Sequence, residues 1–241
     1  MSHPLDGASL RLARADRHLT EADDLVSAFG LDCQNHILAD ENGKILRLNG
    51  WPQLPIILPL VISDVVHNLR AALDYIVYEL AREDSGKVQE NTQFIIEDVK
   101  VDTSDPRRGF DVRSKKHLKG LKQCHIDAIE HCQPYKGVEW TKALRDISNP
   151  DKHRNLTVLS STGRSVQLML EHNPKGRFGT NRLRVVNGGV IVDRYDVHVD
   201  AHDAIAIALA DPSKPGIMRA LRDIQAAVAE TIDAFKPEFK V

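Results

Sequence analysis

Apolar residues recur at helical spacing in several parts of the chain, a pattern that places one face of a helix against a core. A helix over residues 7–29 has Gly30 as its stop signal. A shorter helix over 139–148 ends at Asn149-Pro150, because the residue before a proline avoids the helical region. Charged residues dominate 83–114, which predicts a long surface loop with one strand, Thr92 to Ile96. The remaining helices are predicted over 60–82, 115–132 and 215–235.

Alternation of apolar and polar residues predicts strands in two places. Short apolar runs on either side of Glu41-Asn42-Gly43 predict a β-hairpin over residues 36–48, because Asn-Gly favours tight turns. From Leu156 onward, alternating segments separated by glycines predict about four antiparallel strands. We therefore expect an α+β fold, a helical bundle with a small antiparallel β-sheet packed on it in the C-terminal half.

The predicted elements suggest one integrated domain with two parts. Residues 1–155 form a mainly helical part with the N-terminal β-hairpin, and residues 156–241 form the antiparallel sheet and a closing C-terminal helix. The amphipathic helices at the two ends pair either with each other or with a second copy of the chain, so the pattern leaves a homodimer open.

Composition narrows the functional classes. The chain has 241 residues, of which 42% are hydrophobic and 27% charged, so it can bury a core. With 32 basic and 34 acidic residues and a formal net charge of -2, it has no global attraction to nucleic acid or anionic membranes, although a local basic patch remains compatible. Three cysteines without a CxxC pair fit a reducing compartment. The N-terminus has no apolar run behind its charges, which predicts a cytoplasmic protein that does not enter a membrane.

The predicted helix over 60–82 carries a narrow polar ridge. At about 100° per residue, Asp64, His67, Arg70 and Asp74 share one side, and apolar residues cover the other. Arg70 and Asp74 can pair across one turn, and Asp64 can orient the His67 imidazole. These residue types form directed hydrogen bonds, unlike the Lys and Glu of most solvated faces. A solvated face, a buried structural network and a functional site all remain open.

A second polar cluster follows at 148–156. Asp151, Lys152, His153 and Arg154 combine acid, base and anion-binding chemistry, in what we expect to be a turn between a helix and the first strand of the sheet. Because a buried charge needs a partner, we expect this cluster to meet the ridge, with Arg154 near Asp74 or Asp64 and Asp151 near Arg70. A charged turn without a function is the alternative.

Four segments carry a resemblance to a known family. HNLRAALDYIVYEL (67–80), Gln93-Phe94-Ile95-Ile96, Gln133-Pro134-Tyr135 and NPDKHRNL (149–156) resemble the motifs of a family of uncharacterised bacterial, largely actinobacterial, proteins. The first segment is more loosely similar to HEPN-type helical ribonucleases, in which an arginine precedes a histidine by a short interval. Tyr75 stands where that histidine is often found, so His67 or His153 would have to supply the imidazole.

Three functions follow as hypotheses. The first, implied by the looser resemblance, is a metal-independent HEPN-like nuclease or phosphodiesterase that acts on RNA or another phosphate-bearing ligand without a cofactor. Its catalytic residues would be His67, Arg70, Asp74, His153 and Arg154, and its substrate-binding residues Asn68, Tyr75, Asp151 and Lys152. The second is a site for a divalent metal among the Asp and His residues, which the neighbouring arginines oppose. The third is a non-catalytic binding or scaffold protein in which the same residues form a buried network.

Overall fold

The computed structural model describes seven segments of the chain: 3–35, 37–39, 45–48, 55–153, 183–186, 189–192 and 217–239. Side chains are described for 3–29, 32, 55–148 and 217–239. The chain divides into two compact units, a helical unit (1–19, 61–156 and 218–241) and a second unit (20–60 and 157–217). Each unit is built from segments that lie far apart in the sequence.

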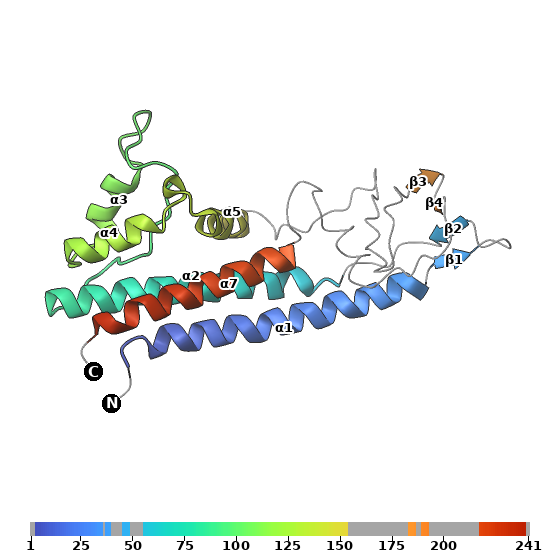
Figure 1. Cartoon of the computed structure of the whole chain (residues 1–241), viewed down its shortest axis with the longest axis horizontal. Helices are drawn as coiled ribbons and strands as arrows, with labels where there is room; N and C mark the ends of the chain where they lie inside the picture. The colour runs from blue at the N-terminus through green and yellow to red at the C-terminus, as the bar shows by residue number, and fades with distance from the viewer. Residues whose placement is uncertain are drawn as a thin grey trace, which may run out of the picture. The chain divides into compact units, whose positions relative to one another are not determined.

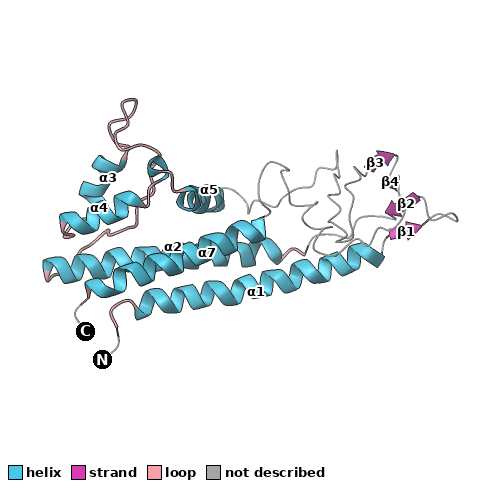
Figure 2. Cartoon of the chain, in the orientation of Figure 1, coloured by secondary structure: helices cyan, strands magenta, loops and turns pink. Residues whose placement is uncertain are grey.

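Long helices form most of the described chain (Figures 1 and 2). Helical residues make up 72% of the part whose side chains are described, and no strand lies in that part. The expected α+β class, with a sheet packed on the helices in the C-terminal half, is therefore wrong, and the described body is helical. The helices are α1 (Asp6–Asn35), α2 (Leu58–Ser85), α3 (Phe110–His117), α4 (Gln123–His131), α5 (Glu139–His153) and α7 (Ile217–Phe235), with the 3-10 turns η1 (Pro134–Lys136) and η2 (Lys236–Glu238).

The core of the helical unit forms along α2, where the predicted apolar face is buried at all nine of its positions between Val61 and Leu80. Five residues of α7 spaced at helical intervals from Met218 to Ile232 are buried as well. Hydrogen bonds tie α1 to both helices: Arg11 donates to Asn68 of α2 at 3.3 Å, and Gln225 of α7 donates to Asp16 at 2.8 Å. Figure 1 shows α1, α2 and α7 running alongside one another.

Several helix boundaries differ from the prediction. Helix α1 passes Gly30 and ends at Asn35. The helix expected over 115–132 is two helices, α3 and α4, which are separated near Gly120, a residue with a φ of 82° that favours glycine. None of the described helices is both long and apolar enough to cross a membrane.

Helix α5 continues through Asn149-Pro150 to His153, so the turn predicted for Asp151, Lys152 and His153 is wrong: their backbone is helical. The residue before a proline is biased against helix but is not excluded from it. The preceding turns of α5 are fixed by packing, because Thr141, Leu144 and Ser148 are buried. Packing of that face favours continuing the helix past the proline.

The segment between α2 and α3 is extended but forms no strand over its described residues 86–109, so the strand predicted at Thr92 to Ile96 is wrong. Phe94, Ile95 and Ile96 are nevertheless buried. Side chains from elsewhere in the helical unit, described below, bind this backbone where a neighbouring strand would otherwise do so.

Four short strands belong to the second unit: β1 (Ile37–Ala39), β2 (Ile45–Leu48), β3 (Leu183–Val186) and β4 (Gly189–Val192). They pair antiparallel in the order β1-β2-β4-β3. Strand β1 pairs with β2, Ile37 opposite Leu48, in the segment where the sequence predicts a hairpin. Two of the four strands thus come from the N-terminal half of the chain. The turn at 40–44 and the strands predicted within 156–182 and 193–200 lie outside the described residues.

Candidate anion-binding site

The side chains of α2 that were predicted to form a site point in three directions around the helix. Relative to Asp64, Arg70 and Asp74 lie at about 240–280° around the helix, whereas Asn68 and Tyr75 lie at about 20–40°. The first pair contacts the extended segment 92–97, and the second pair contacts α1. Asp64 and His67 lie between them and are exposed. One helix therefore uses its polar residues in three separate places.

Arg70 and Asp74 hold the backbone of one residue. The backbone N–H of Phe94 donates to Asp74 Oδ1 at 2.8 Å, and Arg70 Nη2 donates to the Phe94 carbonyl at 3.2 Å. The Phe94 side chain is fully buried. This pair, one turn apart on α2, replaces the hydrogen bonds that a neighbouring strand would give Phe94.

Asn68 and Tyr75, predicted to bind substrate, instead hold α1 against α2. Asn68 is buried, donates to the carbonyl of Asp64 at 2.7 Å and accepts from Arg11 of α1. The Arg11 guanidinium also lies 5.9 Å from the centre of the Tyr75 ring. A Cβ atom at Gly7 would lie only 2.8 Å from Tyr75 Cε1, so the close approach of the two helices requires glycine there.

A cavity of about 510 Å³ opens beside Arg70. We call it the arginine cavity. Its walls come from α2, the segment 93–102, the start of α3 and the later turns of α5. The charged side chains that line it are Arg70, Arg108, Arg113 and Arg145, with Glu97, Asp98, Asp102 and Asp146.

Carboxylates engage three of these arginines to different degrees. Arg145 is closely paired, with Asp98 at 2.8 Å and Asp146 at 2.9 Å; burial lowers its pKa, but these carboxylates outweigh burial and raise it. Arg113 lies 3.7 Å from Glu97, and Arg108, which is largely exposed, lies 3.9 Å from Asp105. The last two contacts are too long for strong hydrogen bonds, so both guanidinium groups keep donors for another acceptor.

Arg70 is the most deeply placed cation of the cavity. Its Nη1 atom is buried and has no hydrogen-bond partner among the described residues. Burial lowers the pKa of Arg70 and nearby Arg113 lowers it further, while Asp74 acts in the opposite direction. A buried donor without an acceptor costs about 1–3 kcal/mol. An anion in the cavity would supply that acceptor.

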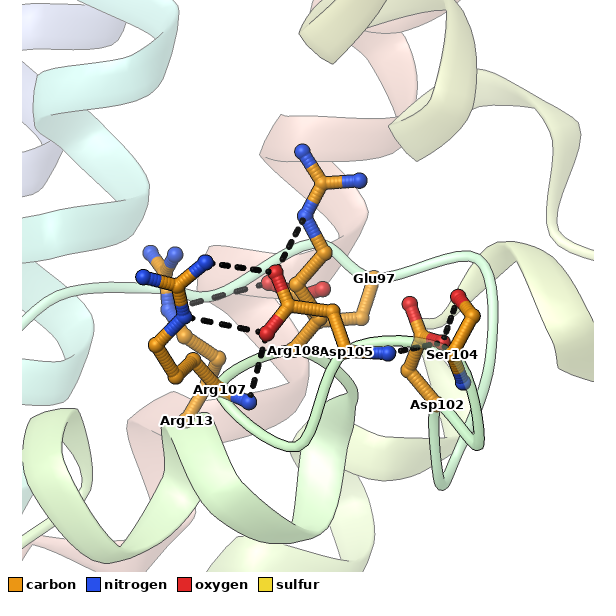
Figure 3. Close-up of polar contacts among 7 residues, drawn as sticks. All are labelled: Glu97, Asp102, Ser104, Asp105, Arg107, Arg108 and Arg113. Carbon is orange, nitrogen blue, oxygen red and sulfur yellow. Dashed lines mark hydrogen bonds and ion pairs between the residues drawn. The ribbon is translucent and has the colours of Figure 1, made fainter.

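The rim of the cavity is a loop that satisfies its own carboxylates (Figure 3). Asp102 Oδ1 accepts from the backbone N–H and the hydroxyl of Ser104, at 2.8 and 2.6 Å, and these bonds hold the pKa of Asp102 below its usual value. Asp105 pairs with Arg107 at 3.0 Å. The loop closes at Gly109, whose φ of 90° suits glycine. The two rim carboxylates are therefore already engaged within the loop.

The side chain of Gln133 also holds the extended segment 92–97 and was not among the predicted site residues. Its fully buried amide donates to the carbonyls of Ile95 and Ile129, both at 2.9 Å, and accepts from the backbone N–H of Glu97 at 2.8 Å. The sequence signals for it are its place just after a helix and before a proline, and the Gln133-Pro134-Tyr135 motif of the family resemblance. Arg108 and Arg113 were also missed, because they stand in the segment predicted to be a surface loop. Arg145 was missed because nothing in its predicted helix, 139–148, distinguishes it.

The structure describes only part of the second polar cluster. The backbone of Asp151, Lys152 and His153 belongs to α5, but their side chains, and all of Arg154, lie outside the described residues. The expected pairs between this cluster and the ridge stay predictions. Instead, the structure brings Arg70 of α2 and Arg145, Asp146 and Ser148 of α5 to the same cavity.

Two further observations concern ligands and relatives. Where side chains are described, no group of three or more His, Cys, Asp or Glu residues is arranged to hold a metal ion. No family model matches the chain, and neither a curated protein nor a solved structure is significantly similar to it. The resemblance to HEPN-type ribonucleases stays a prediction.

Proposed function

We propose that this protein binds a small phosphate-bearing ligand in the arginine cavity. The observation that carries the proposal is the Arg70 side chain, which lines the cavity and whose buried Nη1 atom has no hydrogen-bond acceptor among the described residues. Phosphate oxygens are strong acceptors, and the planar guanidinium fork binds two of them at once. A ligand phosphate at Arg70 would relieve the cost of that unmet donor.

The neighbouring residues support the same ligand class. Arg113 and Arg108 are only loosely paired with carboxylates and can turn toward a bound anion. The cavity volume of about 510 Å³ lies within the range of about 300–1,000 Å³ typical of small-molecule sites. Arg145 is closely paired with carboxylates, so it holds one end of the cavity in place but offers no free donor to the ligand.

Calorimetric titration with inorganic phosphate and with a nucleoside monophosphate, at constant ionic strength, tests this function. We expect saturable binding by the wild type and its loss in Arg113→Met. Arg107→Met is the matched control, because Arg107 lies in the rim loop, is largely exposed and does not line the cavity. Equal binding by both variants, or no binding by the wild type, contradicts the proposal.

A HEPN-like ribonuclease is the second candidate. It is favoured by one observation: His153 lies on α5, the helix that also supplies Arg145 and Ser148 to the arginine cavity. His67, the other predicted proton carrier, is exposed and is not among the residues that line it. Incubating labelled RNA with the wild type, His153→Ala and Arg70→Ala separates the two candidates. Cleavage that both substitutions abolish, with His153→Ala melting like the wild type, supports the nuclease; intact RNA with every protein excludes it.

A further inference from the structure

His125 of α4 lies between two carboxylates and is not among the residues that line the arginine cavity. Its side chain is only 6% exposed, with Nδ1 2.6 Å from Asp84 Oδ2 and Nε2 3.2 Å from Glu238 Oε2. An ionised carboxylate only accepts hydrogen bonds. Both ring nitrogens must therefore carry a proton for both bonds to form, which makes the ring an imidazolium.

Asp84 holds its side of this arrangement firmly. Its carboxylate is almost fully buried and also accepts from the backbone N–H of Lys122 at 2.8 Å, and the Lys122 ammonium lies 3.1 Å away. Burial raises the pKa of Asp84, but these donors together with His125 outweigh burial and hold it below its usual value. Asp84 thus stays ionised and keeps the proton on Nδ1 of His125.

The contact of His125 with Glu238 is the weaker of its two contacts with carboxylates. It belongs to the C-terminal turn η2, its side chain is half exposed, and its bond to His125 is the longer one. The other charged residue of the turn, Lys236, pairs with Asp233 of α7 at 2.7 Å. If His125 loses one of its two ring protons, it loses the one on Nε2. The lone pair of Nε2 and a lone pair of the Glu238 carboxylate then face each other.

The other contacts that hold the C-terminal turn do not depend on the proton on His125 Nε2. His3 Nδ1 accepts from the Leu5 backbone N–H, so His3 Nε2 carries a hydrogen and donates to the Lys236 carbonyl at 3.3 Å in the neutral and charged forms alike. Phe239 is buried and its ring meets that of His3 edge to face. These contacts keep the turn nearby when the bond to His125 is lost.

The turn also forms part of a second cavity, of about 470 Å³, between α4, the start of α5 and α7. Cys132, Trp140 and Ala227 line it, together with His125, Phe235 and Glu238. Glu230 of α7 is a further carboxylate on its wall, and the Phe235 ring meets that of His125 edge to face. Movement of Glu238 would change the wall of the cavity that Trp140 also lines.

We propose that His125 is a proton-controlled latch, which holds the C-terminal turn closed over the second cavity when protonated and releases it when neutral. The bond to Glu238 needs a hydrogen on Nε2 of His125, so it is present when the ring carries both protons and is lost when the ring is neutral. Imidazole is the side chain that changes charge between about pH 5 and pH 8. The latch is independent of the ligand proposed for the arginine cavity.

The test uses the full chain carrying Trp51→Phe, which leaves Trp140 as the one tryptophan of the two in the sequence. Acrylamide quenching of Trp140 and hydrogen exchange at the amides of Lys236, Glu238 and Phe239, corrected for the intrinsic rate, are followed between about pH 5 and pH 8. We expect a one-proton transition with about a tenfold loss of protection at the high-pH end, the equivalent of one hydrogen bond to a charged group.

Two variants and one control decide the outcome. Glu238→Gln, at a half-exposed position that tolerates substitution, removes the transition and leaves the fold intact, and His125→Gln removes it as well. His131→Gln keeps it, because His131 lines the same cavity but is exposed and bonded to the Asp127 carbonyl. A wild type without a transition, or the same transition in Glu238→Gln, overturns the latch.

Discussion

Asp74 accepts a 2.8 Å hydrogen bond from the backbone N–H of Phe94, although the two residues belong to different segments and no strand among the described residues pairs with Phe94. The segment that forms one wall of the arginine cavity is thus held by a side chain of the central helix. Arg70 completes the clamp through the carbonyl of the same residue. The cavity and the core of the helical unit therefore depend on the same contacts.

Replacing Asp74 tests this clamp. Asp74→Ala leaves the Phe94 N–H without its acceptor and removes the nearest carboxylate from Arg70, so we expect a loss of about 1–3 kcal/mol in the free energy of unfolding. Urea denaturation measures it. Asp223→Ala, on an exposed position of α7, should change the free energy by less than about 0.5 kcal/mol. Equal effects of the two substitutions would show that the clamp adds nothing.

Gln133 provides a second test of how the cavity wall is built. Gln133→Ala removes one acceptor and two donors from buried backbone groups, and we expect it to cost at least about 2 kcal/mol. Gln133→Glu keeps the shape but loses the donors and buries a charge, so it should be no better tolerated. Gln123→Ala, which breaks only an exposed bond to Asp127, is the control. Thermal melting of the three variants distinguishes them, and a tolerated Gln133→Glu would speak against the network.

Gly109 at the cavity rim is expected to be intolerant of a side chain for two reasons. Its φ of 90° and ψ of 157° lie in a region reserved for glycine, at a cost of about 1–3 kcal/mol for other residues. A Cβ atom would also lie 2.9 Å from the Lys100 carbonyl oxygen and from the Asp102 nitrogen. Gly137 has a similar φ of 87° but open space around it. Gly109→Ala should therefore lower the melting temperature clearly more than Gly137→Ala, and the reverse order would be inconsistent with this rim geometry.

Asp84 gives a pH dependence whose sign can be worked out. The pKa of Asp84 in the folded protein is held below its usual value, so its contribution to stability is present above the unfolded-state pKa of about 3.9 and is lost as the pH falls through the lower folded value. Asp84→Asn should cost about 3 kcal/mol at neutral pH, since it breaks a buried pair, and the difference from wild type should shrink in acid. Urea denaturation over a series of pH values measures this. The exposed Asp127→Asn should show no such convergence.

The helical part of the fold could be predicted because α2 and α7 carry unbroken apolar faces, and burial follows those faces residue by residue. The break between α3 and α4 was missed, because the apolar spacing of 115–132 continues past Gly120, whose φ of 82° leaves the helical region. The helical conformation at Pro150 could not be predicted either, because the residue before a proline is biased against helix and the packing of α5 outweighs that bias. The sheet that was predicted to pack on the helices is not part of the described helical body. Alternation of apolar and polar residues predicts strands but does not say against which element they pack.

The candidate site was predicted in outline only. Arg70 was identified as an anion-binding residue on the ridge, and it does line a cavity shared with α5. Asn68 and Tyr75 were assigned to the same site, however, although about 100° per residue places them far enough around the helix from Arg70 and Asp74 to contact a different element. Arg113 and Arg145 could not be identified, because only the fold brings these distant arginines to Arg70.

The most direct measurement is a crystal structure of the full chain soaked in selenate, with anomalous diffraction collected at the selenium edge. Selenate has the shape and charge of phosphate and its position is unambiguous. The expected result is an anomalous peak inside the arginine cavity, within hydrogen-bond distance of Arg70 Nη1 and with Arg113 turned toward it. An empty arginine cavity, with selenate only at exposed lysines and arginines, would contradict the proposed anion site.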